Sequence, residues 1–327
     1  MEKFSIDPVN EPIIGIAGVN NELEERIIRN RKEDFLNQDF KELEGKEVEK
    51  TFEHIKMIDW ANAATNELRR KFGLPDFNIP AQNIHLIKEE FWKHEVRAFF
   101  ESKYRAIMIN ESVGVIKIEL LGRILHEMLH FKSYNSLQFT CGNDQKLTRH
   151  QVGLDTLSHG AKKYIFKNFN EAIIEKLTAK LESNALGQAD FLRKDKDRLD
   201  ALRTNNADSV NINSGELLFN ENTYWAEEDG NGFIRAREWK KSIKEEMFDI
   251  LVDKIYQRNK NRFDDKNMVI DEFTRVMFYG GFKEIIKLID DTFWPGTVQA
   301  LEKFENSEKD GKPFNDVVGQ LQFVKDL

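Results

Sequence analysis

Apolar side chains recur at helical spacing early in the chain and then gather into two short runs. In residues 52–61 an apolar residue returns at every third position, and the helical pattern continues to Phe72, after which Gly73 stops it. Residues 84–87 and 106–109 are apolar runs of strand length. The pattern therefore predicts a helix followed by two short strands.

The most continuous apolar pattern predicts a buried helix at residues 115–134. Its apolar positions cover most of the helix circumference, which is typical of a helix surrounded by protein on all sides. Residues 152–154 and 163–166 then have the pattern of two strands separated by a short polar connection. These two runs predict a hairpin.

Helical periodicity returns after the predicted hairpin. Asn168 or Asn170 is placed to cap a second amphipathic helix at residues 171–182. A polar and mostly charged stretch comes next. Three more helical patterns follow it, at residues 239–258, 271–279 and 282–293.

Together these elements predict an α+β fold that is mostly helical, with a small sheet packed on the long buried helix and a helical C-terminal part. The expected divisions are a flexible arm at 1–20, an N-terminal helical part at 21–82, a core at 83–186, a polar linker or excursion at 187–213, a C-terminal helical part at 214–305 and a mobile tail at 306–327.

Charge and length restrict the partners that the chain is expected to bind. The 327 residues carry 57 Asp+Glu against 49 Lys+Arg, a net charge of -8. Nucleic acids and anionic membranes bind mainly through Lys and Arg, so neither is an expected partner. No apolar run has the length of a membrane span. Acidic residues near the N-terminus argue against a secretion signal, so we expect a cytoplasmic protein.

The single cysteine, Cys141, limits the chemistry that is available. One thiol forms neither an internal disulfide, nor a cysteine–zinc cluster, nor a redox pair. A metal site in this chain must therefore use His and carboxylate ligands.

The predicted buried helix contains the pattern HExxH, as His126-Glu127-Met128-Leu129-His130. Residues four apart on a helix lie about 40° apart around its axis, so both imidazoles can reach one ion. Zinc bound in this way activates water, and Glu127 stands beside it as a general base. The competing interpretation is a pair of helix-face histidines bonded to carbonyl groups. Burying three polar residues in an apolar helix without a metal is costly, which favours zinc.

A catalytic zinc site usually has three protein ligands. The extended pattern HExxHxxGxxH is excluded, because Ser133 and Ser136 stand where it requires Gly and His. The remaining candidates for the third ligand are His150, Asp155, His159 and Glu171.

Glu171 is the second residue of the segment Asn170-Glu171-Ala172-Ile173-Ile174-Glu175. With HExxH some forty residues earlier, this segment resembles the NExxSD pattern of the gluzincin, or thermolysin-like, zinc metallopeptidases. The resemblance spans about residues 84–185 and implies a zincin fold for the core. It implies His126, His130 and Glu171 as zinc ligands and Glu127 as general base. Glu175, in place of the usual Asp, is implied as the acid that holds a ligating His.

The resemblance also implies substrate contacts. In the family, the strand before the active-site helix is a sheet edge along which an extended peptide lies. Ala106, Met108 and Asn110 would then contact the substrate backbone.

A group that stabilises the oxyanion is less evident. No His follows His159, so the histidine that thermolysin uses is missing, as is the GAMEN segment of related aminopeptidases. Those aminopeptidases use a downstream tyrosine, which makes Tyr224 the first candidate and Tyr256 the second.

Residues 227–238 partly match a calcium-binding EF-hand loop. The glycine, isoleucine and final glutamate positions fit, but Glu227 stands at the first position and Arg235 at the ninth. A glycine-rich turn between Trp225 and Trp239 explains the same residues.

The sequence thus predicts a zinc metallopeptidase that acts on a peptide or protein, with its oligomeric state left open. One alternative is a catalytically silent interaction or regulatory protein that zinc stabilises. Another is a peptidase whose own arm, residues 1–20, occupies the cleft.

Overall fold

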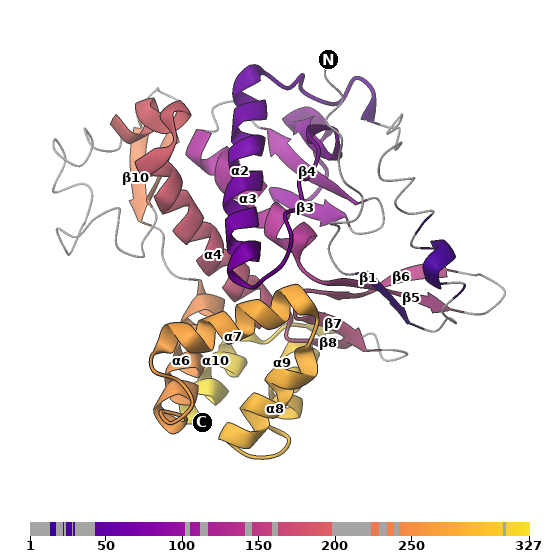
Figure 1. The fold of residues 1–327 in the computed structure, drawn as a ribbon, viewed down its shortest axis with the longest axis vertical. Helices are drawn as coiled ribbons and strands as arrows, with labels where there is room; N and C mark the ends of the chain where they lie inside the picture. Colours follow the sequence, from indigo (N-terminus) through magenta and orange to yellow (C-terminus); the bar gives the residue numbers. More distant parts are fainter. Residues whose placement is uncertain are drawn as a thin grey trace. The chain divides into compact units, whose positions relative to one another are not determined.

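A computed structural model gives the fold of the chain (Figure 1). Only strand β1 (Ile14–Ala17) is described within the predicted arm at 1–20. The described residues are 14–17, 22, 24–27, 29, 43–101, 105–111, 117–140, 146–158, 163–197, 224–228, 234–238, 242–309 and 312–327.

The chain forms two compact units. Their boundaries fall within helices α3 (Lys117–Lys132) and α4 (Lys167–Gln188), each of which begins in one unit and ends in the other. Unit 1 comprises residues 1–10, 31–129 and 177–240, and unit 2 comprises residues 11–30, 130–176 and 241–327.

Helix α2 (Phe52–Lys71) lies in unit 1 and confirms the first predicted helix. The Thr51 hydroxyl oxygen accepts a hydrogen bond from the backbone N–H of His54, and the His54 ring nitrogen Nδ1 accepts one from the backbone N–H of Thr51. The buried side-chain amide of Asn62 bonds both backbone groups of Ile79, so the segment after the helix is held along it.

A three-stranded sheet follows in unit 1. It consists of β2 (Ile84–Lys88), β3 (Ala98–Glu101) and β4 (Ala106–Glu111), in the order β2-β4-β3. Strand β4 runs parallel to β2 and antiparallel to β3. Short 3-10 turns flank β2, at Ala81–Asn83 (η3) and Glu89–Phe91 (η4). The sequence predicted β2 and β4 but not β3, whose apolar run is too short to stand out.

Helix α3 confirms the predicted buried helix. Its first turn is held from two sides in unit 1: the Lys117 ammonium pairs with Glu53, and the Asp195 carboxylate accepts the backbone N–H of Ile118 at 3.3 Å. Asp195 follows a 3-10 turn, η5 (Asp190–Leu192). The apolar residues of α3 are almost fully buried: Ile118, Leu121, Ile124, Leu125, Met128 and Leu129.

The EF-hand interpretation of residues 227–238 is wrong. Strands β9 (Tyr224–Glu228) and β10 (Ile234–Glu238) pair as an antiparallel hairpin in unit 1. An EF-hand loop needs a helix on each side. The paired strands support the glycine-rich turn instead.

A five-stranded sheet lies in unit 2, in the order β1-β5-β6-β7-β8. Residues 152–154, predicted as the first strand of a hairpin, largely form the turn between β6 and β7, while 163–166 contains β8. Gly153 has φ 61°, a left-handed conformation that favours glycine. Besides β1, the sheet consists of β5 (Asn135–Thr140), β6 (Lys146–Val152), β7 (Asp155–Ser158) and β8 (Lys163–Ile165).

In its described residues, unit 2 continues with five helices (Figure 1). The first four lie in the predicted C-terminal part at 214–305 and confirm its helical character, whereas the fifth lies in the predicted tail. Ser242 caps the first of them and Asp265 the second. The helices are α6 (Ile243–Arg258), α7 (Lys266–Tyr279), α8 (Phe282–Thr292), α9 (Thr297–Glu305) and α10 (Val317–Asp326).

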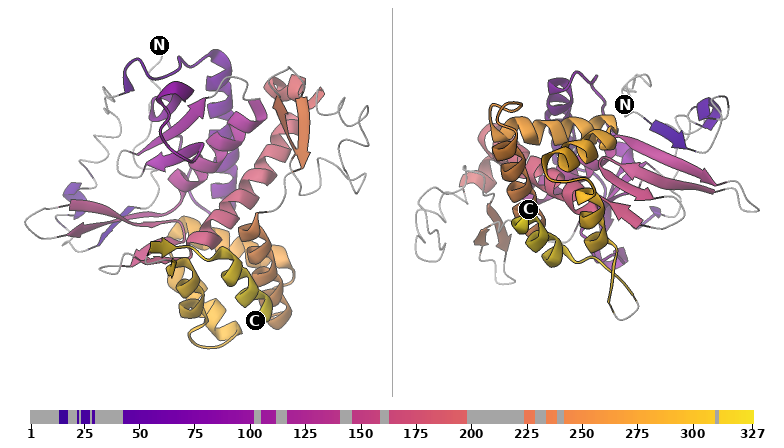
Figure 2. Two further views of the ribbon diagram at one scale, coloured as in Figure 1. Left: turned by 180° about the vertical axis from the view of Figure 1, so that it is seen from behind. Right: turned by 90° about the horizontal axis from the view of Figure 1, so that it is seen from below.

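The expectation of a mobile tail at 306–327 is wrong. Strands β11 (Ser307–Lys309) and β12 (Lys312–Phe314) form a short hairpin, and α10 then packs beside α6, as Figure 2 shows. Val324 is fully buried. This segment is short and only weakly periodic, so its order comes from its contacts within unit 2 rather than from its own sequence.

The described elements are mostly helical with small sheets, which confirms the α+β class. Among the described helices, none is both long and apolar enough to cross a membrane.

Candidate metal centre

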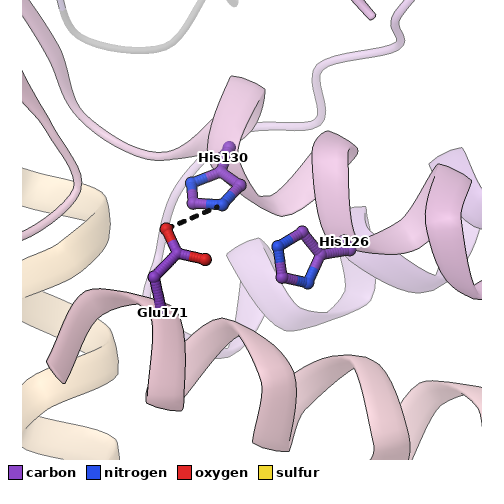
Figure 3. Close-up of side chains that lie close together, drawn as sticks. All are labelled: His126, His130 and Glu171. Carbon is purple, nitrogen blue, oxygen red and sulfur yellow. Dashed lines mark ion pairs between the residues drawn. The ribbon is translucent and has the colours of Figure 1, made fainter. Parts of the chain in front are cut away.

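His126, His130 and Glu171 come together on two facing helical segments (Figure 3). The two histidines lie one turn apart on α3, and Glu171 lies in the second turn of α4. One ligand atom from each side chain lies within 4.8 Å of the others. His130 Nε2 and Glu171 Oε1 are 3.4 Å apart.

The ends of the two helices favour this pairing of charges. His130 lies in the last turn of α3, where exposed carbonyl groups attract a cation, and Glu171 lies near the start of α4, where amide groups favour a carboxylate. The C-terminal end of α3 therefore favours a cation at His130, whereas the start of α4 favours the carboxylate of Glu171.

The three side chains are partly accessible, although their surroundings are buried. The side chains of His130 and Glu171 are 12% and 23% exposed, whereas Met128 and Leu129 on the same turn of α3 are fully buried. The three polar side chains are thus partly accessible to solvent.

The donor set fits zinc. Zinc takes imidazole nitrogen and carboxylate oxygen at about 2.0–2.2 Å, so ligand atoms around a tetrahedral ion lie roughly 3.4 Å apart. The His130–Glu171 distance already has this value, and the three ligand atoms all lie within 4.8 Å of one another. Two His and one Glu also leave one coordination position open.

The other candidates for the third ligand lie outside this group. His150 Nδ1 lies 3.0 Å from the hydroxyl oxygen of Ser136. Asp155 is buried in β7, near Glu305, whose pKa is raised mainly by burial and further by the charge of Asp155. His159 lies outside the described residues. Within the described part of the chain, Glu171 is the candidate that joins the two histidines.

The two remaining acids of the motifs occupy different surroundings. Glu127 is buried, with 6% of its surface exposed, and is not one of the three clustered ligands. Glu175 lies one turn beyond Glu171 and accepts a 2.5 Å hydrogen bond from the hydroxyl of Ser242. Glu175 therefore links α4 to the start of α6, and its predicted contact with a ligating His stays a prediction.

The predicted substrate contacts at Ala106, Met108 and Asn110 are wrong, because β4 is the central strand of its sheet. Ala106 is paired with Glu101 of β3, and Met108 is paired on both sides. The Asn110 N–H donates to Arg97 O at 2.9 Å, and Asn110 O accepts from Arg123 at 2.6 Å. An extended peptide has no free backbone to pair with there.

The outer strands of this sheet differ in how they are covered. The open side of β2 is occupied by residues 46–48, since Val48 N–H donates to Leu86 O and Lys88 N–H donates to Lys46 O. Strand β3 has only β4 as a strand neighbour among the described strands. Any strand added to this sheet would therefore pair with β3.

Arg123 ties the end of β4 to the helix that carries the histidines. Its guanidinium donates to the Asn110 carbonyl and also bonds Glu119 one turn earlier on α3. Because Arg123 lies one turn before Glu127, it fixes β4 relative to the HExxH turn. The sequence showed Arg123 only as one charge in an apolar helix.

Glu182 is a second functional candidate that sequence reasoning missed. Its carboxyl group lies against the backbone of α3 at Gly122, where any Cβ would overlap it. Burial raises the pKa of Glu182 to about 8, with His126 lowering it and Glu119 raising it further. The available sequence signal was Gly122, because a glycine inside an apolar helix often marks a point where another group approaches the helix backbone closely.

The predicted oxyanion donors are not part of the described trio. Tyr224 begins β9, but its side chain lies outside the described residues. The Tyr256 hydroxyl donates to Asp264 O at 3.3 Å, in the connection between α6 and α7. The Tyr224 role stays a prediction, and the Tyr256 hydroxyl is engaged elsewhere.

The site thus brings together three side chains that could hold a metal ion, with a buried carboxylate next to them in the sequence. Comparison of the chain with protein-family models, with curated proteins and with solved structures found no match.

Proposed function

We propose that the protein is a zinc metallopeptidase of the gluzincin type, with a zincin core. The observation that carries the proposal is the cluster of His126, His130 and Glu171, which are the three ligands that the sequence pattern implies. Zinc is the proposed cofactor, and a peptide or protein is the proposed substrate.

The number of ligands favours catalysis over a purely structural metal. Structural zinc sites are closed by four protein ligands, whereas catalytic sites keep three and an open position. The described cluster has three, and two of its side chains are partly exposed. This supports a site that a substrate carbonyl and a water molecule can reach.

Zinc in such a site acts as a Lewis acid that makes water nucleophilic near neutral pH. The Glu127 carboxylate takes a proton from the water as its oxygen bonds to the peptide carbonyl carbon. Glu127 then gives that proton to the amide nitrogen as the C–N bond breaks. The low exposure of Glu127 keeps bulk water from competing for this proton.

Strand β3 is the place where an extended substrate would add to the sheet. The bond from Asn110 N–H to Arg97 O makes these two residues a hydrogen-bonded pair. Antiparallel pairing alternates, so the next residue, Ala98, directs its N–H and C=O away from β4. Ala98 can therefore bond a substrate backbone.

The proposal is tested by incubating the zinc-loaded protein with a complex peptide mixture and identifying new termini by mass spectrometry. Glu127→Gln keeps the three ligands, so we expect it to retain zinc and to lose at least about 100-fold in turnover. Glu67→Gln makes the same change at an exposed position of α2 and serves as the control.

Cleavage by the wild type and by Glu67→Gln, but not by Glu127→Gln, would support the proposal and report the side-chain preference. Equal cleavage by all three proteins would contradict the role of Glu127. Bound zinc without cleavage by any of them would favour the zinc-stabilised interaction protein instead.

A further inference from the structure

The first turn of α4 is held by a residue from the end of α9. The Glu305 carboxylate accepts the backbone N–H of Asn168 at 2.8 Å and that of Lys167 at 3.3 Å, one on each oxygen. Helix N-termini have unpaired amide groups that a capping side chain usually satisfies from the preceding residue. Here the capping group comes from 137 residues later in the chain.

Two amides from the C-terminal segment hold the side chain of Asn168. Its Nδ2 donates to Asn315 Oδ1 at 2.9 Å and to Gln320 Oε1 at 2.7 Å, while its Oδ1 accepts from Asn315 Nδ2 at 2.8 Å. Gln320 in turn donates to Leu301 O at 3.2 Å. The bonds form one connected network from α9 and α10 to the start of α4.

The network is largely buried, so breaking any of its hydrogen bonds costs free energy. Asn168 and Gln320 are fully buried, and Glu305 is 6% exposed. A buried polar group that loses its partner costs about 1–3 kcal/mol, so each member strongly prefers this one arrangement. Apolar packing alone would allow α4 to slide or turn slightly, whereas these bonds fix its start.

Glu171 lies three residues after Asn168, less than one helical turn. A helix rises about 1.5 Å per residue, so the held turn and the ligand are about 5 Å apart along the axis. The position of the Glu171 carboxylate relative to His130, 3.4 Å away, therefore follows from how the first turn of α4 is held.

We infer that Glu305, Asn315 and Gln320 are positioning residues of the metal site, which hold the first turn of α4 so that Glu171 meets His130. The inference rests on the proposed function, because it assumes that zinc binds the trio. Residues that orient ligands from outside a metal site commonly change metal affinity 10- to 100-fold when they are replaced.

The first test uses Glu305→Gln. An amide has one accepting oxygen, so it cannot accept both N–H groups as the carboxylate does. Glu302→Gln is the matched control, since it makes the same change one turn earlier on α9. Two quantities are measured on the full chain: amide hydrogen exchange at residues 167–171 without metal, and zinc affinity by competition with a chromogenic chelator.

We expect Glu305→Gln to speed exchange in the first turn of α4 and to weaken zinc binding about 10-fold, with Glu302→Gln unchanged in both. Unchanged zinc affinity in Glu305→Gln would overturn the inference while leaving the proposed function intact. Failure of the wild type to bind zinc would overturn both, so the two failures are distinguishable.

A second pair of variants separates positioning from general stability. Asn315→Ala removes one partner of Asn168 at a half-buried position, and Ile289→Val removes a buried methylene-sized group in α8. Both are expected to cost about 1 kcal/mol of stability. Only Asn315→Ala should weaken zinc binding. An equal loss of zinc affinity in Ile289→Val would overturn the inference, because packing alone would then explain the effect.

Discussion

Gly122 and Glu182 form an unusual contact between a helix backbone and a buried acid in unit 1. With no Cβ at Gly122, the carboxyl group of Glu182 reaches the surface of α3 one turn before His126. Burial disfavours the charged form, so Glu182 is mostly protonated at neutral pH. A protonated carboxyl beside a metal ligand adds no negative charge that would compete for the imidazole.

Glu182 is expected to make stability depend on pH. Its pKa is about 8 in the folded protein against 4.5 as the ordinary value, so the folded state holds a proton that the unfolded state has lost. Stability from this group is complete below pH 4.5 and is lost as the pH rises through 8. The loss amounts to up to about 5 kcal/mol. Glu182→Gln should remove this pH dependence.

The measurement is urea unfolding between pH 5 and 9 in the presence of a chelator, so that metal ligands do not contribute. At pH 9 the glutamine variant should be the more stable protein, and the exposed change Glu67→Gln should follow the wild type. Parallel curves for Glu182→Gln and the wild type would show that Glu182 ionises freely in the folded protein.

At the scale of elements, acids from distant segments accept backbone N–H groups at the starts of both helices that carry the candidate ligands. Asp195 accepts the Ile118 N–H at the start of α3, and Glu305 accepts two N–H groups at the start of α4. Asn168 and Asn170, the predicted caps of α4, bond elsewhere: Asn170 Oδ1 accepts the Leu154 N–H at 2.8 Å. Capping by distant acids leaves no local sequence signal, so the predicted start of α4 was four residues late.

Strand β3 is the element on which substrate binding is expected to depend. Ala98→Pro removes an N–H that points away from β4, at an outer strand where proline is tolerated. We expect KM for extended peptides to rise several-fold with little change in kcat. Steady-state kinetics on a cleaved peptide measure this, with Ala98→Val as the control that keeps the N–H. Equal KM values for the two variants would exclude β3 as the substrate strand.

The elements that the sequence predicted well are those with long, regular patterns. Helices α2, α3 and α6 to α8 follow apolar periodicity, and α2 and α7 end close to a glycine, so local physics largely determines them. Strand β3 and helix α10 depend on partners in the fold, and the central position of β4 depends on pairing with β3. Neither local spacing nor composition contains that information.

At the scale of the whole molecule, metal binding is expected to contribute to stability. A ligand that binds only the folded state adds about 4 kcal/mol at a thousand times its dissociation constant. Chelation should therefore lower the Tm of the zinc-loaded protein by several degrees, and added zinc should restore it. Differential scanning calorimetry measures the shift. His126→Ala should show no response to chelator, and a wild type without any response would contradict a zinc site.

The clustering of the candidate ligands was predictable where these residues are close in sequence, and less so elsewhere. The spacing of His126 and His130 places both side chains on the same face of one helix. Glu171 was predicted to join them only through the resemblance to a known family, and the structure places it in the same cluster. Arg123 and Glu182 act through contacts with segments far along the chain, at Asn110 and Gly122. Side chains placed by local spacing could be predicted from the sequence, whereas contacts with distant segments could not.

The network at the start of α4 also bears on the order in which the chain is synthesised. A nascent chain that has emerged through α4 already carries His126, His130 and Glu171, but Glu305 and Gln320 have yet to be made. Since folding proceeds as the chain emerges, α4 lacks its polar partners at that stage. With the proposed roles, the zinc ligands are not yet held in position while the chain is on the ribosome. We therefore expect no cleavage of neighbouring nascent chains until synthesis has passed residue 320.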